Sequence, residues 1–486
     1  MMLHTAAEIR RAVASREVSA VEVCRTSLAR AERLNPRLNA FITLDPENAL
    51  ARAAELDRRH ADVASLPLLG VPIAVKDNIC TRGLRTTAGS RILEHYIPPY
   101  DATAIARLQA AGAIVIGKTN CDEFAMGSST EHSAFGPARN PWAAERTPGG
   151  SSGGSAVAVA TRSTPVALGS ETGGSVRQPA ALCGVIGLKP TYGRISRYGL
   201  IAFSSSMDQI GLFATSVMDL AMLLQVVAGP DPQDATASTS PTGNYTAQLG
   251  SGVHGLRVGV PRALLANGVE PGVSRAFDLA LDQLRDAGAV LVDVDLPHAP
   301  HAIAAYTIVA MAEASSNLGR FDGVRYGYRA PGAESLGDMY VKTRAAFGAE
   351  VKRRVMLGTY VLSGGYYDAF YVQAQQLRAL LRQDYETAFA ATDVIAMPTS
   401  PTTAFPLGTR LEDPIQMYLA DVFTVSANLT GLPAVSVPCG FADRLPVGLQ
   451  LTGRAWAEDT LLRVAAEYER HTDWTTVLPP AADSRG

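Results

Sequence analysis

Short apolar runs alternate with helical or glycine-rich segments from Val71 onward, and this alternation constrains the fold more than any other feature of the chain. Four such runs lie at Pro72–Val75, Ile114–Ile116, Val166–Leu168 and Val185–Leu188. Runs of this length bounded by turn residues are typical of strands buried on both faces. The pattern therefore predicts an α/β fold in which a central mixed β-sheet is covered by helices on both faces.

The flanking regions carry patterns of their own. Apolar residues recur at helical spacing in Ala6–Ser15, Ala20–Leu34 and Pro46–His60, which predicts three helices before the sheet begins. Residues 230–244 are polar and rich in turn residues, which indicates a surface loop. Beyond it we expect further elements, namely strands at 256–260, 290–294 and 393–398, a helix at 273–287, a long helical stretch that includes 366–390, and a frayed end at 479–486.

Composition limits the possible partners. The 486 residues carry a formal net charge of −3, so no basic field draws the chain to nucleic acid or to an anionic membrane. The start of the chain has no apolar segment of signal-peptide length and no apolar run could span a bilayer, so we expect a cytoplasmic protein that does not enter the membrane. Its five cysteines have no C-x-x-C spacing, which indicates reduced, buried thiols, and no Cys/His/Asp cluster predicts a metal site.

Two glycine-rich loops and one lysine carry the chemistry. Residues 148–155 read P-G-G-S-S-G-G-S and residues 171–175 read E-T-G-G-S, yet none of the eight histidines lies in either loop. A serine hydroxyl needs a base to act as a nucleophile, and a desolvated lysine can lose its proton near neutral pH. Lys76, in V-K-D-N, is the candidate base. No lysine follows the glycines, so a phosphate-binding loop of the Walker A type is disfavoured.

Neighbouring polar residues have simpler explanations. Ser152, Ser155 and Ser170 lie in or near the same loops, and each is more often a helix cap or a turn residue than a catalytic group. His132 is interpreted in the same way, as a loop or helix-end histidine.

The motifs resemble those of the amidase signature family. K-D-N at 76–78, G-G-S-S-G-G-S at 149–155 and T-G-G-S-V-R-Q-P-A at 172–180 occur in the order and at the spacing of that family. The resemblance implies that Ser175 is the acyl-forming nucleophile, that Ser151 is a bridging serine next to a non-proline cis peptide bond, and that Lys76 is the terminal base.

The same resemblance assigns an oxyanion hole. The backbone amides of Thr172, Gly173 and Gly174 are expected to face the oxyanion that forms when Ser175 attacks an acyl carbon. Glu171 stands where the family commonly has aspartate, and T-V-S-A-N-L-T-G at 424–431 also departs from the usual pattern.

Further segments resemble the A subunits of glutamine-dependent aspartyl/glutamyl-tRNA amidotransferases. They include N-C-D-E-F-A-M-G-S-S-T-E at 120–131 and F-G-A-E-V-K-R-R-V at 347–355, and the resemblance runs from about residue 3 to residue 468. It implies a glutamine pocket in which Arg354 binds the α-carboxylate, Asp421 binds the α-ammonium and Tyr306 adds a hydroxyl. Arg353 is the alternative to Arg354.

The resemblance also implies a division of labour within a heterotrimer. The chain would hydrolyse glutamine and hold no cofactor. The B subunit would use ATP and Mg²⁺, bind the mischarged tRNA and amidate it, while a small C subunit would wrap and stabilise the assembly. Whether the tRNA is that for Gln or for Asn stays open. The alternatives are a free-standing amidase that acts on small amides and a catalytically idle scaffold.

We expect a single domain over residues 1–486. It divides into a helical N-terminal segment (1–62), a core that holds the signature motifs (63–230), the remainder of the intertwined sheet with the substrate-pocket helices (250–475), and a tail (476–486).

Overall fold

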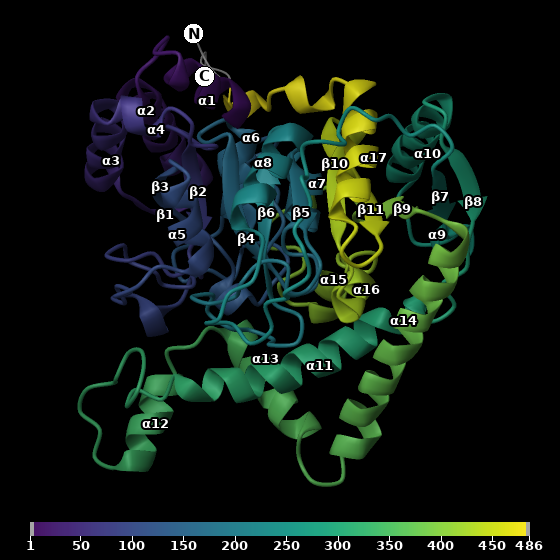
Figure 1. The fold of residues 1–486 in the computed structure, drawn as a ribbon. Coiled ribbons are helices and arrows are strands. Elements are labelled where there is room, and N and C mark those ends of the chain that lie inside the picture. Colours follow the sequence, from purple (N-terminus) through teal and green to yellow (C-terminus); the bar gives the residue numbers. More distant parts are fainter. Residues whose placement is uncertain (1–3, 483–486) are drawn as a thin grey trace.

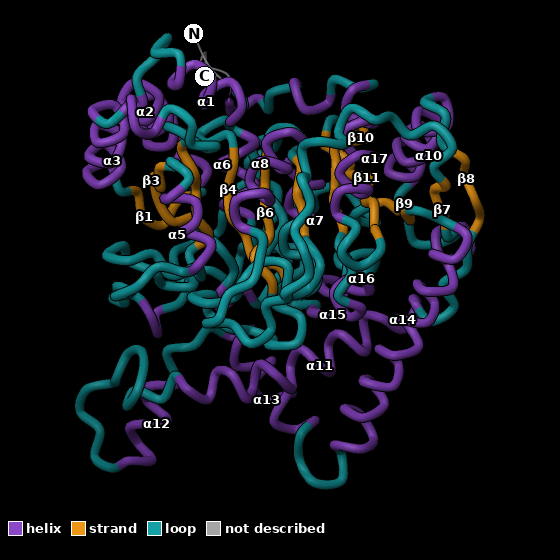
Figure 2. The backbone as a smooth tube through the Cα atoms, in the orientation of Figure 1, coloured by secondary structure: helices purple, strands orange, loops and turns teal. Residues whose placement is uncertain are grey.

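One sheet organises the computed structural model, which describes residues 4–482. Its eleven strands lie in the order β1-β3-β2-β4-β6-β5-β10-β11-β9-β7-β8 (Figures 1 and 2). The strands are β1 (Phe41–Leu44), β2 (Pro72–Lys76), β3 (Ile114–Thr119), β4 (Val166–Glu171), β5 (Ile186–Lys189), β6 (Gln209–Ala214), β7 (Arg257–Val260), β8 (Val290–Asp293), β9 (Val394–Pro398), β10 (Ala434–Ala442) and β11 (Leu445–Gly453).

The sheet is mixed, as the sequence predicts. Strand β2 pairs in parallel with β3 and β4, whereas the central strands from β4 to β9 pair antiparallel. Strands β9, β7 and β8 are parallel again. Every residue of β2, β4, β5 and β6 is buried, so both faces of the sheet are covered there.

Seventeen α-helices surround the sheet in the described part of the chain. They are α1 (Ala6–Ala14), α2 (Ala20–Leu38), α3 (Pro46–Arg58), α4 (His60–Val63), α5 (Thr103–Ala110), α6 (Gly153–Ala160), α7 (Arg177–Cys183), α8 (Val217–Val227), α9 (Arg262–Leu265), α10 (Pro271–Asp286), α11 (Ala302–Asn317), α12 (Leu336–Arg344), α13 (Ala349–Val361), α14 (Gln373–Ala391), α15 (Pro414–Leu419), α16 (Val425–Thr430) and α17 (Glu458–Arg470). No helix in residues 4–482 is both long and apolar enough to cross a membrane.

A second layer lies beyond one end of the strands. Figure 1 shows α11, α13 and α14 across the lower edge of the sheet, with α12 farther out. A separate hydrophobic core joins these helices to the loops at the strand ends, through residues such as Phe124, Phe203 and Phe347. The helical layer is therefore packed against the loops that follow the strands.

The three predicted N-terminal helices are confirmed, but the prediction that residues 1–62 form a helical segment is wrong for part of that range. The three helices form at the expected places, although α2 continues to Leu38. Strand β1 interrupts residues 1–62, and it pairs antiparallel with β3 at the edge of the sheet. Four residues are too few to show a period, so only the pairing with β3 reveals this strand.

Two further expectations are confirmed and one needs correction. The helical stretch that includes 366–390 is present, as a π-helix at Tyr367–Val372 that runs directly into α14. The expected frayed end is wrong for its described part, because Ala481 and Ala482 are buried and the Arg30 Nη2 atom donates a hydrogen bond to the Ala482 carbonyl at 2.9 Å. Residues 483–486 lie outside the described residues. The surface loop at 230–244 is confirmed, since no helix or strand forms there.

Candidate active site

A buried lysine stands at the centre of the site. Lys76 is the last residue of β2 and is fully buried. Its Nζ atom donates hydrogen bonds to Ser151 Oγ at 2.7 Å, Ser152 Oγ at 2.9 Å and the Ser170 carbonyl at 3.2 Å. Burial lowers the pKa of Lys76 to about 8, with nearby ionisable groups opposing the shift only in part. A neutral amine, able to accept a proton, is therefore accessible near physiological pH.

The loop that carries Ser151 needs glycine before it. The peptide bond between Gly150 and Ser151 is cis, as the family resemblance implies. A Cβ atom on Gly150 would lie 2.3 Å from Asp122 Oδ2 and 2.6 Å from the Ser129 nitrogen. Only glycine fits this close approach, which sets Ser151 against Lys76.

Ser175 lies in the neighbouring loop, between β4 and α7. The Ser152 amide donates to the Ser175 carbonyl at 3.2 Å, which holds the two loops side by side. Among residues 4–482, the Ser175 hydroxyl has no hydrogen-bond partner, and the residue is 6% exposed. The structure thus joins Lys76 to Ser151 directly and brings Ser175 into the adjacent loop, with its hydroxyl free.

The predicted oxyanion loop has amides available. Within the described residues, the backbone N–H groups of Thr172, Gly173 and Gly174 donate to no protein acceptor. The Thr172 side chain donates to Asp208 Oδ1 at 2.6 Å, and Thr424 Oγ1 donates to the Gly173 carbonyl at 2.6 Å. These side-chain contacts fix the loop while its amides stay free to bind an anion.

The three predicted glutamine-binding residues come from separate helical segments, and two of them, Tyr306 and Asp421, lie against this loop. Tyr306 comes from α11, Arg354 from α13 and Asp421 from the turn between α15 and α16. A Cβ atom on Gly173 would lie 2.5 Å from Tyr306 Cζ, and one on Gly174 would lie 2.7 Å from Asp421 Oδ1. The two glycines therefore let the pocket wall lie directly against the oxyanion loop.

Arg354, rather than Arg353, faces inward. The Arg354 side chain is 5% exposed and that of Arg353 is 37% exposed. Arg354 Nε donates to Glu350 Oε1 at 2.8 Å, and its guanidinium carbon lies 5.5 Å from the Phe203 ring centroid and 5.2 Å from that of Tyr418. Burial alone would lower the pKa of Arg354, but Glu350 holds this pKa above its ordinary value, so the cation persists.

Asp421 has one oxygen without a partner. Ser128 Oγ donates to Asp421 Oδ2 at 2.5 Å, but the buried Oδ1 atom accepts no hydrogen bond in the described structure. Burial raises the pKa of Asp421 to about 7. An unpaired buried acceptor is costly, by about 1–3 kcal/mol or more for a charged group, so this atom fits a ligand that brings a donor.

The interpretation of the other serines as cap or turn residues is right in position for Ser152 and wrong for Ser155 and Ser170. Ser152 occupies the N-cap position of α6 but makes no capping hydrogen bond, and its hydroxyl instead contacts Lys76 and donates to the Ser170 carbonyl at 3.0 Å. Ser155 lies inside α6 and Ser170 inside β4. Ser152 is thus a further partner of the lysine, and its adjacency to Ser151 is the only sequence signal for it.

Sequence reasoning also missed a buried ion pair next to the Ser175 loop. The Glu171 carboxylate accepts hydrogen bonds from the amides of Val176 and Arg177, each at 3.0 Å, and pairs with the Arg177 guanidinium. Arg177 Nη1 also donates to Gln450 Oε1 at 2.6 Å, and its Nη2 donates to Asn428 Oδ1 at 2.6 Å. This network ties the Ser175 loop to β11 and to α16, the helix within the divergent 424–431 segment.

A second missed residue, Glu123, links the segment after β3 to the helix that carries Arg354. Glu123 Oε2 accepts a hydrogen bond from the Gly348 amide at 2.7 Å, at the start of α13, and Ser90 Oγ donates to its Oε1 at 2.5 Å. Burial raises the pKa of Glu123 to about 7. Glu123 therefore anchors the first turn of the helix that carries Arg354.

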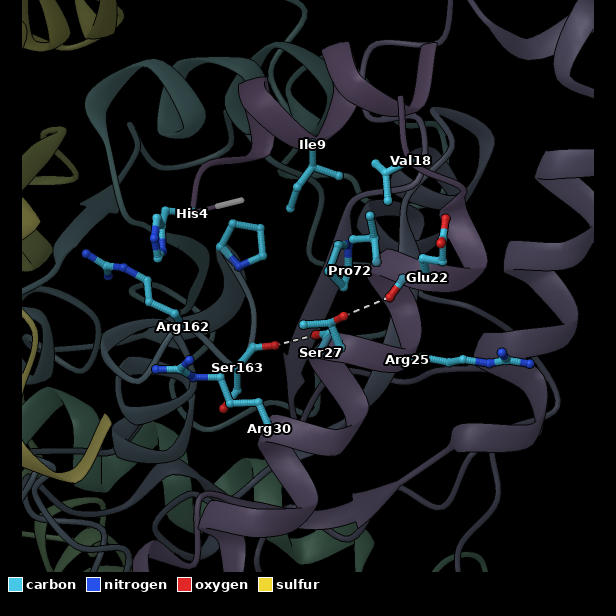
Figure 3. A pocket seen from close by; sticks show the side chains of 13 residues that line it. His4, Ile9, Val18, Glu22, Arg25, Ser27, Arg30, Pro72, Arg162 and Ser163 are labelled. Carbon is cyan, nitrogen blue, oxygen red and sulfur yellow. Dashed lines mark hydrogen bonds between the residues drawn. The ribbon is translucent and has the colours of Figure 1, made fainter. Parts of the chain in front are cut away.

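A cavity elsewhere does not belong to this site. It has a volume of about 440 Å³ and lies beside α1 and α2 (Figure 3). Its lining includes His4, Glu22, Arg25 and Arg162, and none of the predicted site residues. No group of three or more His, Cys, Asp or Glu residues within 4–482 could hold a metal ion.

A lysine buried against two serines of one glycine-rich loop, with a second such loop beside it, is the arrangement expected of a serine amide hydrolase that works without histidine. Comparison with known proteins identifies the family. The family model described as Amidase matches residues 22–462, and the chain belongs to this family.

Named relatives match almost the whole chain. A protein of Roseiflexus sp. (strain RS-1), named as the A subunit of glutamyl-tRNA(Gln) amidotransferase, is 56% identical over 481 residues, which cover 98% of this chain and 99% of the relative. A protein of the same name from Azoarcus sp. (strain BH72) is 55% identical over 486 residues, covering 99% and 100% of the two chains.

Solved structures share the fold. The crystal structure of the A subunit of glutamyl-tRNA(Gln) amidotransferase from Thermotoga maritima is 42% identical, with a TM-score of 0.80 and coverage of 95% of this chain and 94% of that one. The native peptide amidase of Stenotrophomonas maltophilia is 34% identical, with a TM-score of 0.81 and coverage of 96% of both chains. The predicted amidase-signature fold is confirmed.

Proposed function

We propose that the chain is the glutaminase, or A subunit, of a glutamine-dependent tRNA amidotransferase. It would hydrolyse glutamine to glutamate and ammonia and pass the ammonia to a second protein. The observation that carries this proposal is the unpartnered, buried Asp421 Oδ1 atom beside the glycine loop, with Arg354 in the same pocket. A carboxylate and a guanidinium arranged around an oxyanion loop suit a substrate with both an α-ammonium and an α-carboxylate.

The proposed chemistry is acyl transfer through serine. Neutral Lys76 takes the proton of Ser151 while Ser151 takes the proton of Ser175, and Ser175 Oγ forms a bond to the carboxamide carbon. The amides of Thr172, Gly173 and Gly174 stabilise the oxyanion. As the carbon–nitrogen bond breaks, the relayed proton returns to the leaving nitrogen and releases ammonia. Water then attacks the glutamyl ester and yields glutamate.

The pocket residues orient the substrate. The Arg354 fork would bind the α-carboxylate, Asp421 the α-ammonium, and the Tyr306 hydroxyl would complete the wall. Because Gly173 and Gly174 lie against Tyr306 and Asp421, an amino acid held by these groups would have its side-chain amide near Ser175. Such a clamp offers little to an enzyme that acts on unrelated small amides.

The partners follow from the relatives' names. An A subunit implies further subunits, so we propose a heterotrimer in which the B subunit holds ATP, Mg²⁺ and the mischarged tRNA and a small C subunit has a wrapping role. The net charge of −3 agrees with RNA being held mainly elsewhere. The relatives' name supports glutamyl-tRNA(Gln) as a substrate of the assembly, with aspartyl-tRNA(Asn) as a second candidate. We place the assembly in the cytoplasm.

The alternative is a free-standing amidase. The structural likeness to a peptide amidase means that the fold alone does not distinguish the two functions. The amino-acid clamp favours the glutaminase. An idle scaffold is disfavoured because Lys76, Ser151 and Ser175 are all present.

Glutaminase activity decides between these functions. We would measure ammonia release by the chain alone, and then with the B and C subunits, mischarged tRNA and ATP. Strong activation by the assembly, confined to glutamine, is the expected result. Full activity of the isolated chain on many unrelated amides would establish the free-standing amidase instead.

A further inference from the structure

Large apolar side chains are exposed on one protruding part of the helical layer. Figure 1 shows the turn between α13 and α14 projecting away from the sheet. On either side of this turn, Met356 and Tyr360 of α13 are 72% and 47% exposed, and Tyr366 and Phe370 at the π-helix that leads into α14 are 41% and 38% exposed. We call this region the aromatic hairpin surface, and it comprises Met356, Leu357, Tyr360, Tyr366, Tyr367, Phe370 and Tyr371.

The rings of this surface pack on one another rather than into a core. The centroids of Tyr360 and Tyr366 lie 4.2 Å apart, and those of Tyr366 and Phe370 lie 6.0 Å apart. Tyr367 and Tyr371 form a second stacked pair at 5.2 Å. Ordered aromatic rings, already restrained by one another, lose little freedom when a partner covers them. Exposed apolar patches of this kind mark protein interfaces, where Tyr, Phe and Met are enriched.

The aromatic hairpin surface and the proposed glutamine pocket share helix α13. Met356 follows Arg354 by two residues on α13, so one short helix presents a buried arginine to the substrate and apolar side chains to the solvent. Gly358 on the same helix lies so close to α11 that a Cβ atom would come within 1.9 Å of the Met311 carbonyl. A protein bound to the hairpin would therefore press on two helices that line the pocket, α11 with Tyr306 and α13 with Arg354.

Charge around the surface favours an acidic partner. Residues 320–372, which hold α12, α13 and the hairpin, contain eight Arg or Lys and five Asp or Glu. This segment is therefore positively charged, in a chain whose formal net charge is −3. Two of the acidic residues, Asp322 and Glu350, are buried, whereas Lys352, which lies on α13, is exposed. Complementary charge at an interface rim guides association.

We infer that the aromatic hairpin surface binds the protein that receives the ammonia, and that the contact face of this protein is apolar with an acidic rim. The inference rests on the proposed function, since ammonia must leave the Ser175 site for a second protein. Docking beside the glutamine pocket would place the acceptor near the source and let its binding adjust Arg354. A standard interface covers about 800 Å² on each partner, so residues of α13 and α14 next to the aromatic hairpin surface would take part.

A triple variant, Tyr360→Ser with Tyr366→Ser and Phe370→Ser, tests the inference. A matched control changes three apolar residues elsewhere, Ile97→Ser, Met218→Ser and Leu279→Ser, which are 58%, 41% and 63% exposed. Titration calorimetry of each full-length protein with the purified B subunit, in the presence of the C subunit, gives the dissociation constant. We expect the hairpin variant to weaken binding at least about 100-fold and the control less than about threefold.

Basal glutaminase activity and thermal unfolding of each variant show whether it folds. A folded hairpin variant that binds the B subunit as tightly as the unchanged protein overturns the inference. A hairpin variant that loses only self-association also overturns the inference, because the occupant would then be a second copy of the chain. A hairpin variant that loses only tRNA binding overturns it as well. If the unchanged protein fails to bind the B subunit at all, the proposed function fails, which is a distinct result.

Discussion

The proposed relay and the proposed glutamine pocket both border the loop that carries Ser175, but they differ in how fully their polar groups are paired. Lys76 ends strand β2 and Ser151 lies in the loop before α6, and the lysine makes three hydrogen bonds. The pocket residues come from helical segments outside the sheet, and Asp421 keeps one oxygen unpaired. The Lys76–Ser151 link is formed without a ligand, whereas Asp421 in the proposed pocket still lacks one partner.

The proposed catalytic groups and the proposed substrate-binding groups therefore lie in different layers of the fold. A nucleophile and its base must be held within a fraction of an ångström, so they lie where packing is tightest. The groups that choose the substrate lie on a layer that can vary, or respond to a partner, without disturbing the sheet. Changes in the relay should therefore abolish turnover, and changes in the pocket should mainly alter affinity.

Loss of the nucleophile should give the largest effect. Ser175→Ala should reduce glutamine-dependent transamidation by on the order of 10³-fold or more, because no other group can form the acyl ester. Supplied ammonium salt should restore transamidation, since the second active site is untouched. The measurement is product formation by the assembled complex with each nitrogen donor. Failure of ammonia rescue in a folded variant would contradict the two-site arrangement.

Removal of the proposed base, Lys76, should have the second largest effect on activity. Lys76→Met fills a similar volume without an amine, and we expect kcat to fall by about 10³-fold with little change in KM. In the unchanged protein, kcat should rise as pH increases through about 8, because the neutral amine is the active form. A kcat that falls over this range would rule out Lys76 as the base.

The two neighbouring arginines offer a matched test of the pocket. Arg354→Ala should raise KM for glutamine by about 10–100-fold through loss of a charged hydrogen bond. Arg353→Ala, the control on the exposed side of the helix, should change KM by less than about threefold, because that side chain is 37% exposed. Equal effects from the two variants would refute the assignment of Arg354 as the carboxylate clamp.

The unpaired Asp421 should make glutamine binding depend on pH. Its raised pKa of about 7 means that the carboxyl is protonated below that pH, and the neutral acid cannot pair with an ammonium. KM should therefore rise as pH falls through about 7. Asp421→Asn should raise KM and remove this dependence. Steady-state kinetics on both sides of this pH, with kcat followed separately, gives the comparison, and an unchanged pH profile in the variant would contradict the role of Asp421.

The smallest effect is expected at Glu123, which anchors the first turn of the helix that carries Arg354. Glu123 has a pKa of about 7 in the folded protein, above its ordinary value, so its contribution to stability is greatest at low pH and is lost as pH rises toward 7. The melting temperature of the unchanged protein relative to Glu123→Gln should thus decline as pH rises from about 5 to about 7. Thermal unfolding at several pH values tests this, and a difference that grows with pH would contradict it.

The sequence predicted those features of the structure that depend on residues close together in the chain. The glycines at 149–150 and 173–174 are required by close approaches of backbone to side chain, so the loops could be recognised from their composition. Short strands such as β1 and the side-chain partners of Ser152 could not, because they depend on residues distant in the chain. The choice of Arg354 over Arg353 likewise needed the packing of α13 against Phe203 and Tyr418.

The sequence by itself determined the mixed α/β sheet and the lysine and two serines proposed for catalysis, because buried periodicity and glycine loops are written in contiguous residues. Only the tertiary structure decided which groups meet. Lys76 acquires its lowered pKa through burial, Asp421 is left unpaired by the walls around it, and Glu171 and Arg177 pair across the nucleophile loop. Burial and pairing arise from the whole packed chain, so no short stretch of residues specifies them.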